Sequence, residues 1–314
     1  MAQLVKLLDY ITRYETKAFH YPTQFIRLKQ EHWEQLMRQW EEENDLELLE
    51  QIPNDEKKIE SETKEEKKKF LWKFFKKKES PILEERFIRT LPTTKKQLIT
   101  YFLNQLMPFQ LKWATSTITH TSFTDKNYMY EEKLKTLLQR LPDIYLIMYY
   151  PIFHVKNAPF ESEIIIISPI GIEILTIVDA PHNARIVMTG ERVWDVETEV
   201  KTTKLIDPTI ALKRTEHVVR SILNKYGVDI PIQKTIMAES NYFLYDTAPY
   251  QTKLVGKNEY EDWMDEKKAL HSPLKNVQLK AMEALLRHCQ TTAVRRPEWE
   301  KDDDEFKTVA DYEA

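Results

Sequence analysis

Two apolar stretches separated by a short turn form the clearest pattern of the chain. Residues Glu163 to Ser168 and Ile172 to Val178 are nearly continuous runs of isoleucine, leucine and valine, and Pro169-Ile170-Gly171 joins them. Strands that are buried on both faces have runs of this kind. The pattern therefore predicts a β-hairpin in the core.

On either side of this hairpin, helical and extended patterns alternate. A capping acid followed by proline favours a helix start at Asp207-Pro208. The alternation predicts an α/β (α+β) core with a mixed sheet flanked by helices. The predicted elements are a helix from Tyr130 to Leu141, strands from Ile144 to Tyr150, Arg185 to Met188 and Glu191 to Trp194, a helix from Asp207 to Tyr226, and a strand from Ile230 to Ala238.

The beginning of the chain has helical patterns. Leu4, Leu7, Leu8 and Ile11 recur at helical spacing and predict a helix within Met1 to Lys17. A second helix is predicted after Tyr21-Pro22-Thr23, with Thr23 as its N-cap. We interpret the apolar stripe of this helix as packing surface rather than as a ligand groove. The stripe consists of Ile26, Trp33, Leu36, Met37 and Trp40.

Beyond residue 80 the patterns are shorter. Ile82 to Leu91 predicts a short helix, and Thr93 or Thr94 caps a further helix, KKQLITYFLNQL. We expect Pro108 to end that helix, because proline has no backbone N–H to donate. The following residues QLKWATSTITHTSF alternate as in a strand.

These patterns predict four regions. Residues 1–125 form a helical N-terminal module, and residues 126–240 form the α/β domain. Residues 241–296 form a helical extension with helices from Asn258 to Ala269 and from Leu274 to His288. Residues 297–314 form an acidic tail that we expect to be disordered.

Composition narrows the class of protein. The net charge of -4 produces no strong field for nucleic acid, so an anion-binding role requires a local cluster. The N-terminal residues lack the order of a secretory signal, and no apolar run approaches the roughly 20 residues that span a bilayer. We therefore expect a cytoplasmic protein. The eight histidines show no paired metal spacing, and the one cysteine, Cys289, excludes thiolate zinc sites.

The segment Lys67 to Lys78 has the most unusual composition. Read as a helix, it has an aromatic face and a lysine face, which suits the surface of an anionic membrane or a phosphate backbone. It could equally dock on the protein itself, with the acidic run Glu56 to Glu66 neutralising its lysines. The residues expected to make anion or membrane contacts are Lys67, Lys68, Lys69, Phe70, Trp72, Lys73, Phe74, Phe75, Lys76, Lys77 and Lys78.

From about Tyr130 to Glu239, the order of elements resembles the nuclease-related domain (NERD) family, a branch of the PD-(D/E)xK restriction-endonuclease-like superfamily. The resemblance implies a restriction-endonuclease-like mixed sheet. It is carried by a Leu-rich helix with Glu131 and Glu132, the strand ESEIIIISPIG, the turn and tryptophan of Gly190 to Trp194, and the Asp207-Pro208 helix containing His217.

Active members of that superfamily are expected to hold Mg²⁺ with carboxylates and to place a lysine two residues after the second acid. Alternate residues of a strand point to the same face, so the acid and the lysine of an acid-x-Lys pair lie on the same side of the sheet. Aligned on the turn, Glu163 takes the place of the first acid, Thr176 the place of the second acid, and Val178 the place of the lysine. Threonine is a poor Mg²⁺ ligand, and valine cannot position water.

Neighbouring residues do not restore the pair. Glu173 lies on the opposite strand face, Asp179 falls beyond the strand on that same wrong face, and Ala211 replaces a glutamine of the family's helix start. We therefore expect a catalytically degenerate member without a metal or other cofactor. Glu131 and Glu132 then lie in a solvated first helical turn.

The sequence predicts a binding or scaffold component of a bacterial cytoplasm, with an unidentified protein partner and a place at the inner membrane surface through Lys67 to Lys78. Two alternatives stay open. One is a Mg²⁺-dependent nuclease acting on DNA that uses Glu131 or Glu132, Glu163 and a lysine such as Lys156. The other is a protein that binds nucleic acid through Lys67 to Lys78 without cleaving it.

Overall fold

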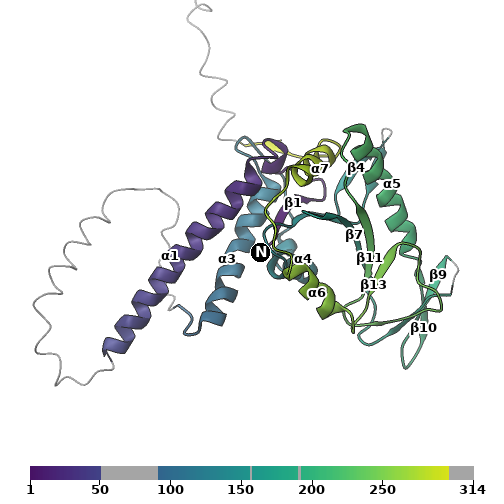
Figure 1. Cartoon of the computed structure of the whole chain (residues 1–314), viewed down its shortest axis with the longest axis horizontal. Coiled ribbons are helices and arrows are strands. Elements are labelled where there is room, and N and C mark those ends of the chain that lie inside the picture. The colour runs from purple at the N-terminus through teal and green to yellow at the C-terminus, as the bar shows by residue number, and fades with distance from the viewer. Residues whose placement is uncertain (51–90, 156–157, 190–191, 297–314) are drawn as a thin grey trace, which may run out of the picture. The chain divides into compact units, whose positions relative to one another are not determined.

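The computed structural model describes residues 1–50, 91–155, 158–189 and 192–296 (Figure 1). The chain divides into two compact units, one formed by Met1–Arg27 with Gln105–Ala314 and the other by Leu28–Asn104. The predicted boundaries after residues 125 and 240 stay predictions.

The first unit is built on a six-stranded mixed sheet in the order β1-β3-β6-β7-β11-β13. β1 runs parallel to β3, and β7, β11 and β13 run parallel to one another. β3, β6 and β7 are antiparallel neighbours. The strands are β1 (Gln3–Leu7), β3 (Leu146–Tyr149), β6 (Ile164–Ser168), β7 (Gly171–Ile177), β11 (Ile232–Met237) and β13 (Thr252–Val255).

The predicted hairpin is confirmed as the centre of this sheet. β6 and β7 pair from Ile164 opposite Leu175 to Ser168 opposite Gly171, and all five residues of β6 are buried. Gly171 is needed at the turn because a Cβ there would lie 3.0 Å from the carbonyl oxygen of Pro231. The continuous apolar sequence thus reflects a strand pair covered on both faces.

Helices flank the sheet, as predicted. α5 (Thr209–Lys225) contacts β7 and β11, whereas Trp263 of α6 (Tyr260–Lys268) reaches the opposite face of β7. Figure 1 shows α4 (Glu132–Arg140) beside α6 and away from α5. α7 (Asn276–Leu286) contacts β6 and α5. The predicted mixed sheet with flanking helices and an N-terminal helical region is therefore confirmed.

The ends of α5 follow the predicted capping chemistry. The Asp207 carboxylate accepts hydrogen bonds from both the N–H and the hydroxyl of Thr209, at 2.8 and 2.7 Å. Gly227 follows the helix with φ of 63°, a conformation that favours glycine. The sequence therefore fixes this helix, which lies over the hairpin, at both ends.

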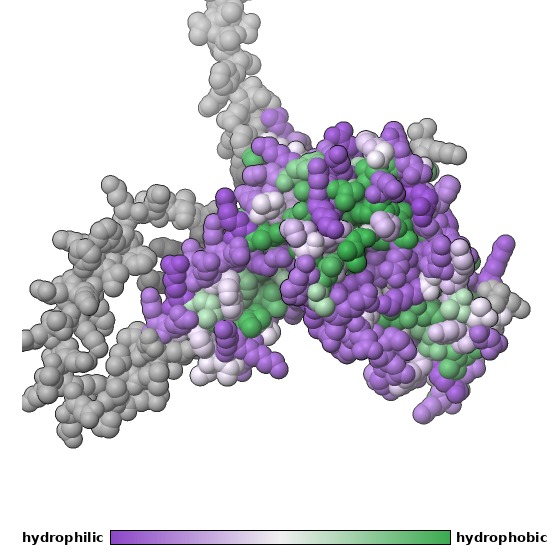
Figure 2. Space-filling model, in the orientation of Figure 1, coloured by the Kyte–Doolittle hydropathy of each residue, from purple (hydrophilic) through white to green (hydrophobic). Residues whose placement is uncertain are grey.

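A second sheet of four strands has the order β10-β9-β8-β12. Its strands are β8 (Arg185–Val187), β9 (Val193–Glu197), β10 (Thr202–Ile206) and β12 (Tyr242–Leu244). Trp194 of β9 is buried, whereas Val200, Ile206 and Leu244 are exposed. Figure 2 shows a hydrophobic patch over this sheet on an otherwise largely hydrophilic region. Two small sheets complete the unit, β4 (Ile152–Val155) with β5 (Ala158–Glu161) and β2 (His120–Thr121) with β14 (Val294–Arg295).

The prediction of a helix within Met1 to Lys17 is wrong. Gln3–Leu7 is a fully buried strand at the edge of the six-stranded sheet, and only the short 3-10 helix η1 (Arg13–Glu15) follows it. Leu4 pairs with Ile147 of β3. A short apolar run is compatible with a helix or with a strand, and here the pairing with β3 stabilises the strand.

The predicted end of the helix KKQLITYFLNQL at Pro108 is also wrong. α3 (Lys95–Thr115) continues through Pro108 and takes in the first part of the strand expected after it, while the later part contains the short strand β2 (His120–Thr121). Buried Gln110 explains the continuation, because its amide accepts from the Leu4 N–H at 3.0 Å and donates to the Ala2 carbonyl at 2.7 Å. Contacts with β1 thus outweigh the hydrogen bond that proline removes.

Most of α1 (Tyr21–Glu50) and the start of α3 belong to the second unit. The rings of Trp33 and Phe102 lie 5.1 Å apart, and the Trp40 indole donates to the Pro92 carbonyl at 2.6 Å. The tryptophan stripe is therefore packing surface, as interpreted. At the start of α3, the Thr94 hydroxyl accepts from the Gln97 N–H, which confirms the predicted cap.

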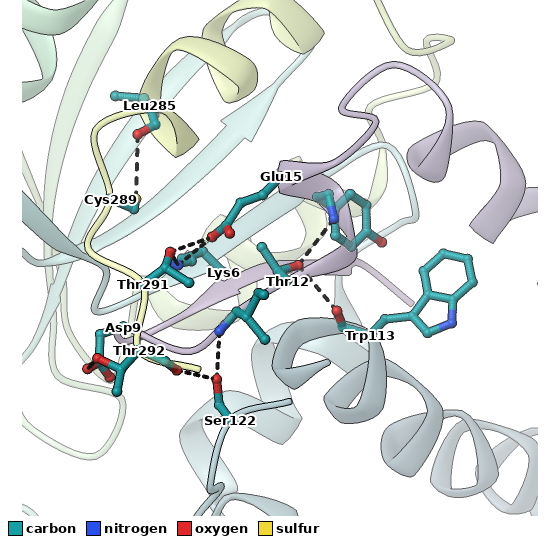
Figure 3. A network of polar contacts seen from close by, with 12 residues as sticks. Lys6, Asp9, Thr12, Glu15, Trp113, Ser122, Leu285, Cys289, Thr291 and Thr292 are labelled. Atoms are coloured by element: carbon teal, nitrogen blue, oxygen red, sulfur yellow. Dashed lines mark hydrogen bonds and ion pairs between the residues drawn. The ribbon is translucent and has the colours of Figure 1, made fainter. Parts of the chain in front are cut away.

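A polar network joins the two ends of the first unit (Figure 3). Lys6 of β1 is 0% exposed, and its ammonium contacts Glu15 at 2.5 Å and the Thr291 hydroxyl at 3.0 Å. Thr292 donates to the Asp9 carboxylate at 2.7 Å. Residues after α7 therefore hold the first strand and η1 in place.

Three predicted segments lie outside the described residues, apart from Leu91 at the end of the second: Lys67 to Lys78, Ile82 to Leu91, and the tail from Pro297. In the part of the chain that the structure describes, no helix is long and apolar enough to cross a membrane.

Candidate functional site

The resemblance places the candidate site where β6 begins and β7 ends. Continuing the register that pairs Ile164 with Leu175 puts Glu163 beside Thr176. Both lie on the α5 side of the hairpin, where the Thr215 hydroxyl of α5 accepts from the Glu163 N–H at 3.1 Å. The structure thus brings the first predicted acid position next to the second.

Glu163 lies beside the neutral Thr176 hydroxyl, at the position where the resemblance would require a second acid. Burial raises the pKa of the Glu163 carboxyl group, and the nearby Thr176 hydroxyl partly opposes that rise. Thr176 Oγ1 is itself buried, and none of the described residues gives it a hydrogen bond of good geometry. The interaction between the two side chains is therefore weak, and their surroundings favour the neutral form of the acid.

Val178 lies directly after β7 and is 7% exposed. Its N–H donates to the Met237 carbonyl of β11 at 2.8 Å, which continues the parallel pairing past the end of the strand. The side chain that replaces the expected lysine is thus apolar and fixed in the sheet.

Glu131 and Glu132 differ in their surroundings. Glu131 is the N-cap residue of α4, and its carboxylate accepts from the Tyr149 hydroxyl at 3.4 Å. Glu132 begins α4 and is exposed, as expected for a solvated first turn. Lys133 Nζ lies 3.7 Å from the Asp179 carboxylate.

Tyr150 is the feature that the sequence reading missed. It follows β3 with φ of 46°, a strained value for a residue other than glycine. Burial and the charges of Glu163, Glu131 and Asp179 raise the pKa of its phenol to about 12. Three carboxylates from separate segments thus act electrostatically on one tyrosine, and the only signal in the sequence is the Tyr149-Tyr150 pair at the end of a buried strand.

Glu173 lies on the other face of β7, as predicted from strand alternation. Its carboxylate accepts from the Thr235 hydroxyl and from the Trp263 indole at 3.0 Å, and it pairs with Lys267 Nζ at 2.6 Å. Glu173 and Lys267 are both buried. This complete set of partners makes Glu173 part of the packing between β7 and α6.

The donor set does not fit the Mg²⁺ ion that the resemblance implies for active members. Glu163 is joined by a neutral hydroxyl at Thr176 and a methyl surface at Val178, whereas Mg²⁺ favours carboxylates and water. Across the described residues, no group of three or more histidine, cysteine, aspartate or glutamate side chains could hold a metal ion.

The remaining predicted site residues do not join this group. Lys156 and the segment Lys67 to Lys78 lie outside the described residues. Ala211 and His217 belong to α5, and His217 is exposed on its outer surface.

Comparison with known proteins gives one short similarity. A stretch of 55 residues is 51% identical to a protein described as an RNA 2',3'-cyclic phosphodiesterase from Geobacillus stearothermophilus, and it covers 18% of this chain and 18% of that protein. A match of this length does not assign the chain to a family. No family model and no solved structure matches the chain.

Proposed function

We propose that the protein is a catalytically degenerate nuclease-like protein that serves as a binding or scaffold component. One observation carries the proposal: Thr176 of β7 and Val178 directly after it are a neutral hydroxyl and a buried apolar side chain, at the positions where the resemblance would require an acid and a lysine. Neither side chain can bind Mg²⁺ strongly or activate water. A scaffold role is consistent with a hairpin that forms the core of the sheet but has neither the acid nor the lysine at the positions of Thr176 and Val178.

Incubation of supercoiled plasmid with the full chain and Mg²⁺ or Mn²⁺ tests this proposal. We expect no cleavage above that of a sample inactivated with a chelator. Cleavage that survives purification and disappears in Glu163→Ala, but not in the exposed control Asp262→Asn on α6, would contradict the proposal. A sharper arm introduces Thr176→Glu with Val178→Lys and asks whether cleavage appears.

A Mg²⁺-dependent nuclease acting on DNA is the first alternative, and the carboxylates around Tyr150 favour it. Glu163, Glu131 and Asp179 all act on the same phenol, so under this alternative a divalent ion would have to hold Glu163 in its ionised form against the effect of burial. Under this alternative, Mn²⁺ raises the unfolding temperature of the wild-type chain, and Glu163→Ala abolishes the increase. The proposed function expects no such difference.

Binding of nucleic acid without cleavage is the second alternative, and the outer surface of α5 favours it. Lys213, Arg214 and His217 are exposed there, and the Arg214 guanidinium lies 5.4 Å from the ring centre of Phe160. Cations beside an aromatic ring suit a single strand. The name of the 55-residue match makes RNA worth testing beside DNA.

Salt dependence tests this alternative. If α5 contacts phosphates, binding of a single-stranded RNA or DNA should weaken steeply with ionic strength. Arg214→Gln should then flatten the slope, whereas Lys280→Gln on the exposed side of α7 should leave it unchanged. If Lys67 to Lys78 is the contact instead, its deletion alone should flatten the slope.

Attachment to a membrane surface is part of the proposal and rests on Lys67 to Lys78, outside the described residues. Sedimentation with anionic and with neutral vesicles tests it. Binding to anionic vesicles that is lost when the segment is deleted supports attachment, and equal, negligible binding to both kinds of vesicle removes it.

A further inference from the structure

A hollow of about 440 Å³ lies where the parallel strands β7, β11 and β13 end. Its walls come from the residues that follow these three strands and from α4. In open α/β sheets, ligands bind at the carboxyl ends of parallel strands, and small-molecule sites have volumes of roughly 300–1,000 Å³. Location and size therefore both suit a small ligand.

The floor of the hollow is apolar. Leu137 of α4, Val178 after β7 and Met237 of β11 line it, and all three are buried. The charged side chains of the lining are exposed or half-buried. An apolar floor with a few polar groups around it is the usual composition of a small-molecule site.

Two lysines reach the hollow from different walls. Lys133 extends from α4 and lies 3.7 Å from Asp179, whose side chain is 91% exposed. So long and exposed an ion pair contributes little, so a ligand can replace Asp179. Lys257 donates to the neutral Asn183 amide oxygen at 2.8 Å and lies 5.5 Å from the ring centre of Tyr242.

Buried Asn241 ties the three loops together. The side-chain amide of Asn241 donates to the Pro181 carbonyl in the loop after β7. The main-chain carbonyl of Asn241 accepts from the backbone N–H of Lys257 at 2.7 Å. Gly256 allows this approach, since a Cβ there would lie 3.0 Å from the Asn241 oxygen. Lys257 is therefore held in position before any ligand arrives, which reduces the entropy that binding would cost.

Acidic groups at the rim limit the size of the ligand. Asp179 and Glu239 are exposed and line the hollow, and Glu239 adds to the effect of burial in raising the pKa of Tyr260. These carboxylates would repel a long polyanion that crossed the rim. A compact ligand with one anionic group can contact the two lysines without crossing the rim that carries the Asp179 and Glu239 carboxylates.

We propose that this hollow binds a small phosphate monoester, with its phosphate at Lys133 and Lys257 and its apolar body on Leu137, Val178 and Met237. Lysine binds phosphate as a point charge, without requiring the flat geometry that an arginine–carboxylate pair prefers. The hollow shares Val178 and Asp179 with the candidate nuclease site, but the lysines that would hold the phosphate are not part of that site, so the proposal does not depend on whether the chain cleaves nucleic acid.

Titration calorimetry of the full chain with phenyl phosphate and with inorganic phosphate tests the proposal. We expect phenyl phosphate to bind more tightly than inorganic phosphate, because only its ring can cover the apolar floor. Lys257→Gln and Lys133→Gln should each weaken its binding by about tenfold or more, the loss typical of one charge-assisted hydrogen bond.

Lys253→Gln is the matched control, because Lys253 lies on β13 and pairs with Glu266 outside the hollow. It should leave the affinity for phenyl phosphate unchanged. The substituted lysines are exposed or half-buried, and thermal unfolding checks that each variant folds. No binding of millimolar phenyl phosphate to the wild-type chain, or an equal loss in all three variants, would overturn the proposal.

Discussion

Glu173 and Glu163 lie on opposite faces of one hairpin and meet very different surroundings. Glu173 has the Thr235 hydroxyl, the Trp263 indole and the Lys267 ammonium around its carboxylate. Glu163 faces the hydroxyl of Thr176, which makes no hydrogen bond of good geometry with any described residue. Within the described parts of the chain, Glu173 is therefore paired with a cation, whereas Glu163 lies beside a neutral hydroxyl.

This difference shows which elements can support a buried charge. α6 supplies an indole and a lysine from the same helix to one face of β7. On the other face, α5 uses Thr215 for the backbone of Glu163. A buried carboxylate needs a cation or several donors to stay charged, and among the described residues those of the α6 face of β7 provide them.

Glu173→Ala should have the largest effect. It leaves the buried Lys267 ammonium unpaired, and breaking a buried pair in this way costs about 3–5 kcal/mol. Urea denaturation of the purified chain measures the loss. Glu173→Ala combined with Lys267→Met should recover part of it, and a double variant as unstable as the single one would argue that the ion pair is not the cause.

Two threonine-to-valine changes should have opposite signs. Thr235→Val removes a hydrogen bond to charged Glu173, worth about 1.5–3 kcal/mol, whereas Thr176→Val removes a buried hydroxyl without a good partner and should stabilise by about 1 kcal/mol. The Thr176→Val gain should be smaller at pH 8 than at pH 5, because the hydroxyl favours ionised Glu163. Denaturation at both pH values measures these changes, and destabilisation by both variants contradicts the comparison.

Glu163→Gln should remove a pH dependence. Burial raises the pKa of Glu163 in the folded chain above its ordinary value of 4.5, so the folded state binds the proton more tightly than the unfolded state. Stability then falls as pH rises from 4.5 through the folded pKa. The variant should be more stable than the wild type at pH 8, and the difference should vanish below pH 4.5. A constant difference at all pH values would exclude titration of Glu163 as the cause.

Glu266→Gln should have the smallest effect. Its carboxylate pairs with Lys253 at 2.7 Å, but both side chains are more than a third exposed. Exposed pairs contribute under about 1 kcal/mol. Denaturation in low and high salt measures the loss, which should shrink in high salt. A loss of stability as large as that of Glu173→Ala would mean that burial does not explain the difference in strength between the Glu173–Lys267 and Glu266–Lys253 pairs.

The core hairpin could be predicted from the sequence because its signal is local and long. Continuous apolar residues from Ile164 to Ile167 fit little else than a strand covered on both faces. The strand at Gln3–Leu7 could not be predicted, because Leu4 and Leu7 fit a helix equally well until β3 is present. Likewise, the continuation of α3 past Pro108 depends on contacts between Gln110 and β1.

The candidate site could be predicted in part. Strand alternation correctly separated Glu173 from Thr176, because side chains alternate between faces. It could not place Tyr150, whose effect arises from carboxylates of three separate segments around one phenol. The hollow beside α4 was missed for the same reason, since Lys133 and Lys257 are far apart in sequence.

The network around Lys6 has a consequence for the order in which the chain folds. Lys6 and Thr291 are separated by 285 positions, so a ribosome completes nearly all of the first unit before the first strand meets its final partner. Until then β1 carries a lysine at a position that the finished sheet buries. We therefore expect the edge of the sheet to close late in synthesis, and chains that stall before residue 291 to expose it to chaperones or to neighbouring strands.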